Sequence, residues 1–279
     1  MSYKTILIHL NDPRRAERLV AAALSVAGDD KVHLVGLHLS PGLAAVSPLA
    51  VPYAGDVVEV SFAEERDTAA KVEELFHRAT AGQPVVAEWR PVEMVAGDLA
   101  EVVVRHGRCA DLLIASQTDP DWDFSPALDF PERLAVAAGR PVLVIPNAGT
   151  TPEIGRSVLV AWNGSREAAR AVFDAMPLLQ RARKVRVVGL SEPTRGKGVR
   201  EPDLGLAATL ARHGVAAEAV QSVARGEDVG EVLLSRLAEC DADLLVMGAW
   251  GHSRLHELVF GGVTRHIARH MTVPTLLSH

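Results

Sequence analysis

Short, continuous runs of apolar residues alternate along this chain with segments in which apolar residues recur at helical spacing. The runs at 6–10 (ILIHL), 158–162 (VLVAW) and 243–248 (DLLVMG) have the length and composition of strands that are buried on both faces. Helical spacing is found in residues 13–24 and 228–237. This order of strand, helix and strand predicts a parallel β-sheet covered by helices on both faces.

One stretch near the N-terminus follows neither period. Residues 41–55 are rich in proline, alanine and glycine, which interrupt regular structure. We therefore expect a long loop there, followed by a helix over about residues 63–80.

The pattern occurs twice along the chain. Five segments of the first half match five segments of the second in the same order, at an offset of about 130 to 153 residues. The pairs are KTILI (4–8) with RSVLV (156–160), VHLVGLH (32–38) with VRVVGLS (185–191), GDLAEVVV (97–104) with EDVGEVLL (227–234), ADLLIA (110–115) with ADLLVM (242–247), and RPVLVIP (140–146) with TVPTLLSH (272–279). A repeat of this length predicts two tandem domains, residues 1–147 and 153–279.

The last apolar run of each half follows a proline, in PVLVIP (141–146) and PTLLSH (274–279). Each run is expected to form an edge strand of its own domain, with unpaired backbone groups. Pairing these two strands would cover both edges. We therefore predict an intramolecular contact between the two domains through their terminal strands.

Composition excludes several classes of protein. Of 279 residues, 48% are hydrophobic and 23% are charged, which is enough apolar material for a packed core. A net charge of −6 provides no general field for nucleic acid or an anionic membrane. No run approaches the roughly 18 apolar residues of a membrane span, and charged residues follow the N-terminus too soon for a signal peptide. We expect a cytoplasmic protein in which Cys109 and Cys240 are buried, reduced thiols.

Candidate chemistry lies in the loops that follow strands of the second half. In an open α/β sheet, ligands bind beyond the carboxyl ends of the strands, where the strand order reverses. Residues 161–165 (AWNGS) and 248–253 (GAWGHS) follow two such strands, and residues 260–264 (FGGVT) precede an expected helix over 265–270. Glycine lets backbone N–H groups approach a phosphate, and a helix N-terminus adds further donors. The alternative is that these glycines only form tight turns.

The spacing Gly248-x2-Gly251-x9-Gly261, followed by small residues and a helix, resembles the nucleotide-binding signature of the universal stress protein family. The whole chain resembles a tandem member of that family. The resemblance implies two Rossmann-like domains of the adenine nucleotide alpha hydrolase-like type, each with a mostly parallel five-stranded sheet and helices on both faces. It also implies a cytoplasmic location, dimer-like pairing of the domains and a role in the stress response.

Carried over residue by residue, the resemblance implies a site for ATP or AMP, with Mg²⁺, in the second half only. The candidate residues are Asn163, Gly248, Gly251, Gly261, Gly262, Val263 and Thr264. Two positions depart from the family pattern, because Asn163 replaces an aspartate and Gly262 replaces a serine or threonine. Loss of one hydroxyl donor is worth about tenfold in affinity. Trp162 either fills the space of an adenine or stacks on it.

The first half lacks the motif glycines and is predicted not to bind nucleotide in this manner. The corresponding loop contains Asp119, Asp121, Asp123 and Asp129, which would repel phosphate. The acidic run also lacks the glycine and the distal glutamate of a calcium loop, so we interpret it as a solvated loop.

Histidines provide a separate hypothesis. His252 and His256, like His266 and His270, are four residues apart, a spacing that places two imidazoles on one face of a helix. No third metal ligand occurs at recognisable spacing. His9, within the first predicted strand, is interpreted as a hydrogen-bonded core histidine.

Three functions follow from these observations. The leading hypothesis is a non-enzymatic universal stress protein that acts through ligand or protein binding, with an unidentified protein partner and a homodimer as further expectations. The alternative is an ATP-binding switch with slow ATPase or autophosphorylation activity. The third is a metal-dependent hydrolase centred on the second-half histidines.

Overall fold

The computed structural model describes residues 2–41, 55–94, 98–119, 130–149, 153–191, 204–223, 228–249 and 262–279. The N-terminal half comprises β1 (Thr5–His9), α1 (Pro13–Ala27), β2 (Val32–Pro41), α2 (Gly55–Thr80), β3 (Val85–Met94), α3 (Leu99–Gly107), β4 (Leu112–Ser116), α4 (Phe130–Ala137) and β5 (Val142–Ile145). The C-terminal half comprises β6 (Ser157–Trp162), α5 (Arg166–Asp174), α6 (Met176–Leu179), β7 (Lys184–Ser191), α7 (Leu204–Arg212), β8 (Ala217–Val223), α8 (Val229–Glu239), β9 (Leu244–Gly248), α9 (Gly262–His270) and β10 (Thr275–Ser278).

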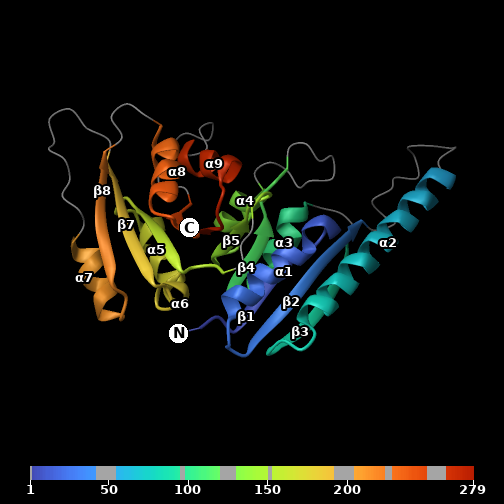
Figure 1. Cartoon of the computed structure of the whole chain (residues 1–279). Helices are drawn as coiled ribbons and strands as arrows, with labels where there is room; N and C mark the ends of the chain where they lie inside the picture. The colour runs from blue at the N-terminus through green and yellow to red at the C-terminus, as the bar shows by residue number, and fades with distance from the viewer. Residues whose placement is uncertain are drawn as a thin grey trace.

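The ten described strands form one sheet in the order β3-β2-β1-β4-β5-β10-β9-β6-β7-β8. Strands within each half pair in parallel, whereas β5 and β10 pair antiparallel, with Leu143 opposite Leu276. The sheet therefore runs through the whole molecule, from β3 and α2 at one end to β8 and α7 at the other (Figure 1). The predicted α/β fold class and the pairing of the two proline-led strands are both confirmed.

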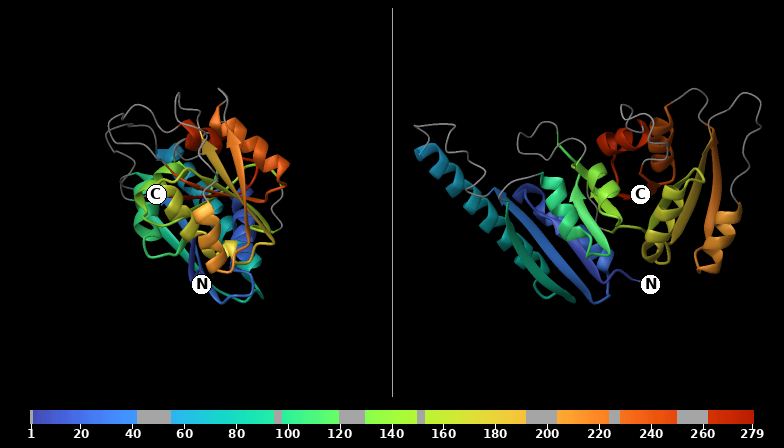
Figure 2. Two further views of the ribbon diagram at one scale, coloured as in Figure 1. Left: turned by 90° about the vertical axis from the view of Figure 1, so that its left-hand side faces the viewer. Right: turned by 180° about the vertical axis from the view of Figure 1, so that it is seen from behind.

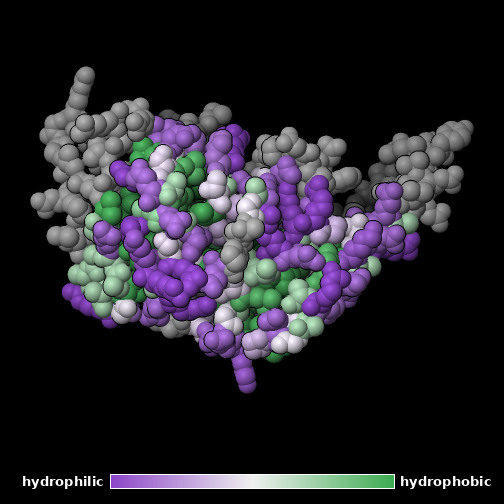
Figure 3. Space-filling model, viewed as in Figure 1, coloured by the Kyte–Doolittle hydropathy of each residue, from purple (hydrophilic) through white to green (hydrophobic). Residues whose placement is uncertain are grey.

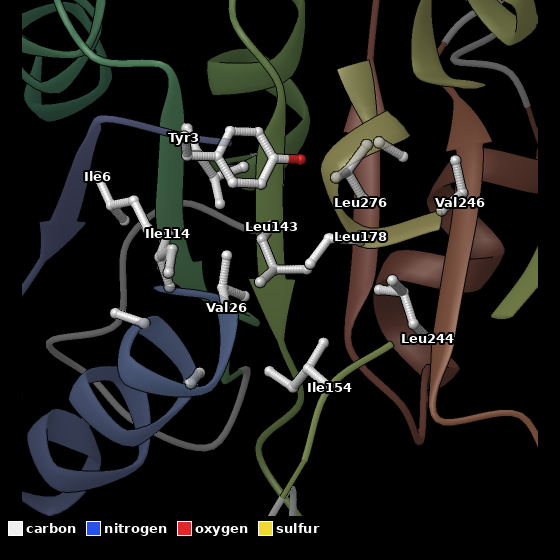
Figure 4. Close-up of a cluster of buried hydrophobic side chains, with 14 of the residues drawn as sticks. Tyr3, Ile6, Val26, Ile114, Leu143, Ile154, Leu178, Leu244, Val246 and Leu276 are labelled. Carbon is white, nitrogen blue, oxygen red and sulfur yellow. The ribbon is translucent and has the colours of Figure 1, made fainter. Parts of the chain in front are cut away.

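Helices cover both faces of the sheet. One face carries α1, α2, α5, α6 and α7, and the opposite face carries α3, α4, α8 and α9 (Figure 2). Each face has a continuous hydrophobic core to which both halves contribute. Figure 4 shows part of the first core, where Val26, Leu143, Leu178 and Leu276 come from both sides of the β5/β10 seam. Burial of this shared apolar surface holds the halves together.

Matching residues of the repeat have matching structural roles. The Asp111 carboxylate accepts hydrogen bonds from two backbone N–H groups at the start of β1 (2.7 and 3.0 Å), and the Asp243 carboxylate accepts three at the start of β6 (2.8, 3.1 and 3.1 Å). Asp98 and Asp228 cap the N-termini of α3 and α8. These two pairs of aspartates therefore fix equivalent connections between helices and strands in the two halves.

Two local expectations differ from the structure. Helix α2 begins at Gly55, within the stretch expected to be a loop. Valines at 57, 58 and 60 obscure its helical period, because β-branched residues are typical of strands. The rest of the expected loop, residues 42–54, lies outside the described residues.

The cysteines also differ from expectation. Cys109 is exposed and Cys240 is partly buried. Both lie in the connections between a helix and a strand, where Cys240 is the C-cap residue of α8, and neither lies within the buried strand that follows. Among the described helices, none combines the length and hydrophobicity needed to cross a bilayer.

Gln117 links the two halves on the second face of the sheet. It follows β4, is 6% exposed, and its Nε2 donates to the carbonyl oxygens of Ala268 (2.9 Å) and Arg269 (3.0 Å) at the C-terminus of α9. Its Oε1 accepts from the backbone N–H of Asn147 (2.9 Å). One buried carboxamide thus satisfies backbone groups of both halves.

Replacing Gln117 with leucine should lower the free energy of unfolding by about 2–4 kcal/mol, because one backbone donor and two backbone acceptors at the seam lose their partner. Urea unfolding followed by circular dichroism measures the change. The matched control is Gln180→Leu, since Gln180 is exposed and donates to the His213 carbonyl oxygen (3.0 Å). Equal losses in the two variants would contradict the role assigned to Gln117.

Candidate functional site

The strand order of the C-terminal half reverses between β6 and β9. Strands β7 and β8 continue on one side of this pair, and β10 lies on the other. The two strands are parallel, with Val160 opposite Val246, so they end together near Trp162 and Gly248. The segments after these two strands are therefore at the place where open α/β sheets bind ligands.

Asn163 shapes the turn between β6 and α5. Its Oδ1 accepts a hydrogen bond from the Ser165 N–H (3.0 Å), and Ser165 Oγ accepts one from the Ala168 N–H (3.1 Å) at the start of α5. Gly164 between them has φ of +73°, a conformation that favours glycine. Asn163 is exposed, and its side-chain NH₂ points to no described acceptor. It can therefore donate to a ligand while its oxygen maintains the turn.

Gly248 has a structural reason to be glycine. A Cβ at this position would lie 2.6 Å from both the Ala168 nitrogen and the Glu167 carbonyl carbon. The end of β9 thus packs directly against the backbone of α5. This close approach accounts for Gly248 without reference to a ligand.

The first turn of α9 consists of Gly262, Val263 and Thr264. We expected the helix to begin at Arg265, but it begins at Gly262, so these three candidate residues supply N–H groups that have no acceptor within the helix. Gly262 is exposed, and a Cβ there would meet open space. Thr264 is 4% exposed, which leaves little of its side chain accessible to a ligand. The candidates Gly251 and Gly261, and also Trp250, lie outside the described residues.

Trp162 packs toward the hydrophobic core. It is partly buried against the face that α5 and α6 cover, whereas the preceding Ala161 and Val263 of α9 pack on the opposite face. The indole therefore belongs to the other side of the sheet from the first turn of α9. This placement favours a packing role for Trp162.

Glu167 is an acidic residue of this site that sequence reasoning missed. It lies in the first turn of α5, is 7% exposed, and its Cβ is 2.9 Å from the position that a Cβ on Gly248 would take. Burial acts to raise the pKa of Glu167, but a hydrogen bond from the Arg166 guanidinium and donors at the helix N-terminus hold the pKa below its usual range. A negative charge therefore lies beside the end of β9. The sequence signal that could have identified Glu167 is its position in the first turn of the helix that follows β6.

The equivalent place in the N-terminal half lies between β1 and β4 and contains an arginine. Arg15, whose side chain is 12% exposed, forms ion pairs with Asp12 (3.3 Å) and Asp119 (2.7 Å). Its Nη1 also donates to the Gln117 carbonyl oxygen (2.7 Å). Two carboxylates and a carbonyl oxygen therefore surround the Arg15 guanidinium, and Asp12 also pairs with Arg14 (3.0 Å), so the donors of Arg15 are engaged by the protein itself. Asp121, Asp123 and Asp129 lie outside the described residues.

The histidines of α9 are engaged with their own helix and with α8. The rings of His266 and His270 are 4.4 Å apart, and His270 Nδ1 lies 2.9 Å from the His266 carbonyl oxygen. His266 Nε2 lies 3.1 Å from Glu231 Oε1. Within the described ranges, no three side chains of histidine, cysteine, aspartate or glutamate are placed to hold a metal ion. His252 and His256 fall outside those ranges.

Sequence comparison supplies the relationship that the geometry suggests. Residues 155–279 match the universal stress protein family. The C-terminal half of this chain belongs to the universal stress protein family. The resemblance inferred from the glycine spacing and the repeat is confirmed for this half, and the N-terminal half repeats its strand order in the same sheet. No curated protein is significantly similar to the chain in sequence.

Solved structures extend the likeness to the full length. A universal stress protein from Archaeoglobus fulgidus DSM 4304 matches with a TM-score of 0.69 at 15% identity, covering 98% of this chain and 95% of that one. A functionally unknown protein from Pseudomonas aeruginosa PAO1 matches with a TM-score of 0.55 at 14% identity, covering 99% and 92%. A universal stress protein in complex with cAMP is 22% identical, covers 44% of this chain and 97% of its own, and has a TM-score of 0.33. The full-length matches show that the chain has the fold of tandem universal stress proteins.

Proposed function

We propose that this tandem universal stress protein acts in the stress response as a non-enzymatic binding protein. We further propose that ATP or AMP, with Mg²⁺, binds in its C-terminal half beyond β6 and β9. The first turn of α9 carries this proposal, because exposed Gly262 and its neighbours present N–H groups that have no acceptor within the helix, in a domain that matches the family. The Asn163 carboxamide supports it, because its oxygen is hydrogen-bonded within the turn and its NH₂ group can donate to a ligand.

A pair of substitutions at Gly262 tests the nucleotide site. Neither needs space from the protein, since a Cβ there meets no atom within 4 Å. Gly262→Ser restores a hydroxyl donor and should tighten ATP binding by about tenfold. Gly262→Asp places a carboxylate beside the phosphates and should weaken binding by about tenfold or more.

Isothermal titration calorimetry with ATP and AMP, with and without Mg²⁺, measures both effects. Identical affinities of the serine and aspartate variants would exclude α9 as the phosphate site. ADP release during the same incubations would favour the ATP-binding switch over the non-enzymatic function.

We also propose that residues 1–147 and 153–279 are the two domains, that the protein acts in the cytoplasm, and that it contacts a protein partner. A homodimer would have to use surfaces other than β5 and β10, because these strands already pair with each other. On the face shown in Figure 3, hydrophilic residues cover much of the described surface and hydrophobic residues form smaller patches. Light scattering after size-exclusion chromatography reports the oligomeric state.

A further inference from the structure

A polar cleft lies at the seam between the halves, away from the nucleotide site proposed above. Its volume is about 280 Å³, and its walls are the C-terminal end of α1, the segment 153–156 before β6, and the end of α6 with the residues that follow it. Ser25, Arg156, Arg181 and Arg183 are among the lining residues. The cleft therefore uses both halves of the chain.

The charge of this seam cleft is positive. Three arginines and one glutamate line it. Arg156 Nε is 2.6 Å from Glu153 Oε2, so this pair is compensated. Arg181 and Arg183 form no ion pair with any described residue and add two positive charges to the walls. Such an excess favours an anion with two or more charges.

Arg181 is held in place by the other half. Its Nη1 donates to the Val26 carbonyl oxygen (2.6 Å) and its Nη2 to the Ser25 carbonyl oxygen (3.2 Å), both at the C-terminus of α1. These two bonds leave three of its five N–H donors for other acceptors. Because the guanidinium is already oriented, a ligand that binds it loses less entropy.

Arg183 is not engaged in this way. Among the described residues, its side chain has no hydrogen-bond or ion-pair partner, and it is exposed. Backbone donors nearby are already used, since Asp243 accepts from three N–H groups at the start of β6. An anion in the cleft would therefore be recognised by guanidinium groups, which match phosphate oxygens in bidentate geometry.

We propose that the seam cleft binds a diphosphate-class anion through Arg181 and Arg183. The volume lies just below that of typical small-molecule pockets, so it suits an inorganic diphosphate better than a whole nucleotide. The ligand would contact residues of the C-terminal half whose orientation depends on α1 of the N-terminal half. Its binding therefore stabilises the association of the halves.

Inorganic pyrophosphate is the probe, titrated by calorimetry against the full chain, with ATP and sulfate in parallel. Arg183→Ala should weaken pyrophosphate binding by about tenfold, the effect of one charge-assisted contact. Arg212→Ala is the matched control, because it makes the same change of net charge at an exposed position outside the cleft. Pyrophosphate should also raise the melting temperature of the native chain and raise it less in Arg183→Ala.

Several results would overturn the proposal. The first is the absence of saturable binding up to millimolar pyrophosphate. The second is equal weakening of binding by Arg183→Ala and Arg212→Ala. The third is loss of pyrophosphate binding in Gly262→Asp while Arg183→Ala binds as the native chain does. The last result would place the anion at α9. ATP could also bind more tightly than pyrophosphate and lose affinity in Arg183→Ala. That result would identify a nucleotide as the ligand of the cleft and overturn the preference for inorganic diphosphate.

Discussion

Replacing Gly248 with alanine should lower the free energy of unfolding by about 3 kcal/mol, the upper part of the range for inserting atoms into a packed site. The added Cβ would lie 2.6 Å from the Ala168 nitrogen and from the Glu167 carbonyl carbon. Backbone atoms cannot rotate away as the end of a side chain can, so α5 must shift from β9. Urea unfolding of the full chain measures the loss.

The matched control is Gly262→Ala, where the added Cβ meets no atom within 4 Å. Its stability should change by no more than about 0.5–1 kcal/mol. Equal stability of the two variants would show that α5 does not pack on Gly248 as described. The result also affects the design of binding experiments, because loss of nucleotide binding in a Gly248 variant would report a displaced helix and not a lost contact.

Acid should destabilise the protein through His9. This histidine is 5% exposed in β1, its ring lies 5.1 Å from the Phe130 ring, and no described residue forms a hydrogen bond with its Nε2. Burial, with repulsion from His38, lowers the pKa of His9 from 6.5 to about 3. It was expected to be a hydrogen-bonded core histidine. The structure confirms the burial, and a side-chain hydrogen bond with Asn11 acts to raise the pKa, while Nε2 has no partner among the described residues.

The sign of the pH effect follows from proton binding. Between pH 6.5 and about 3, the unfolded state binds a proton at His9 that the native state does not. The stability that neutral His9 provides is therefore complete above pH 6.5 and is lost as the pH falls. The slope from this group should reach about 1.4 kcal/mol per pH unit.

Urea unfolding between pH 7.5 and 4.5 tests this expectation with His9→Leu, which cannot bind the proton. As the pH falls, the unfolding free energy of the native chain should decrease more than that of His9→Leu, so any advantage of the native chain at pH 7.5 should shrink or reverse. The control is His213→Gln, at an exposed position on the C-terminal side of α7, which should keep the native pH dependence. A parallel pH dependence in His9→Leu and the native chain would show that His9 is not the responsible group.

Several features of the fold were predictable because they depend on local pattern. The internal repeat placed Asp111 and Asp243 at equivalent points before anything was known of their hydrogen bonds. Proline before the last apolar run of each half indicated edge strands, and the physical cost of unpaired edges indicated that they would join. The start of α2 was predicted less well, because β-branched residues weaken the helical signal.

The candidate site was predictable as a region but not in its internal contacts. Strand order and glycine-rich segments pointed to the ends of β6 and β9, two strands that the structure places side by side. Three contacts of the site depend on residues that are distant in sequence. They are the packing of Gly248 on α5, the burial of Glu167, and the ion pairs of Arg15 with two carboxylates. The spacing of residues along the sequence does not show which distant residues will lie in contact.

The sequence by itself determined the alternation of strands and helices, the duplication and the glycine-bearing segment, because periodicity and turn chemistry are properties of neighbouring residues. Only the tertiary structure decided that β5 and β10 pair antiparallel with Leu143 opposite Leu276, and that Gln117 bonds the end of α9. It also decided that three arginines gather in a cleft at the seam. Those features arise when chain segments more than a hundred residues apart pack together, and burial and charge at a contact depend on both partners.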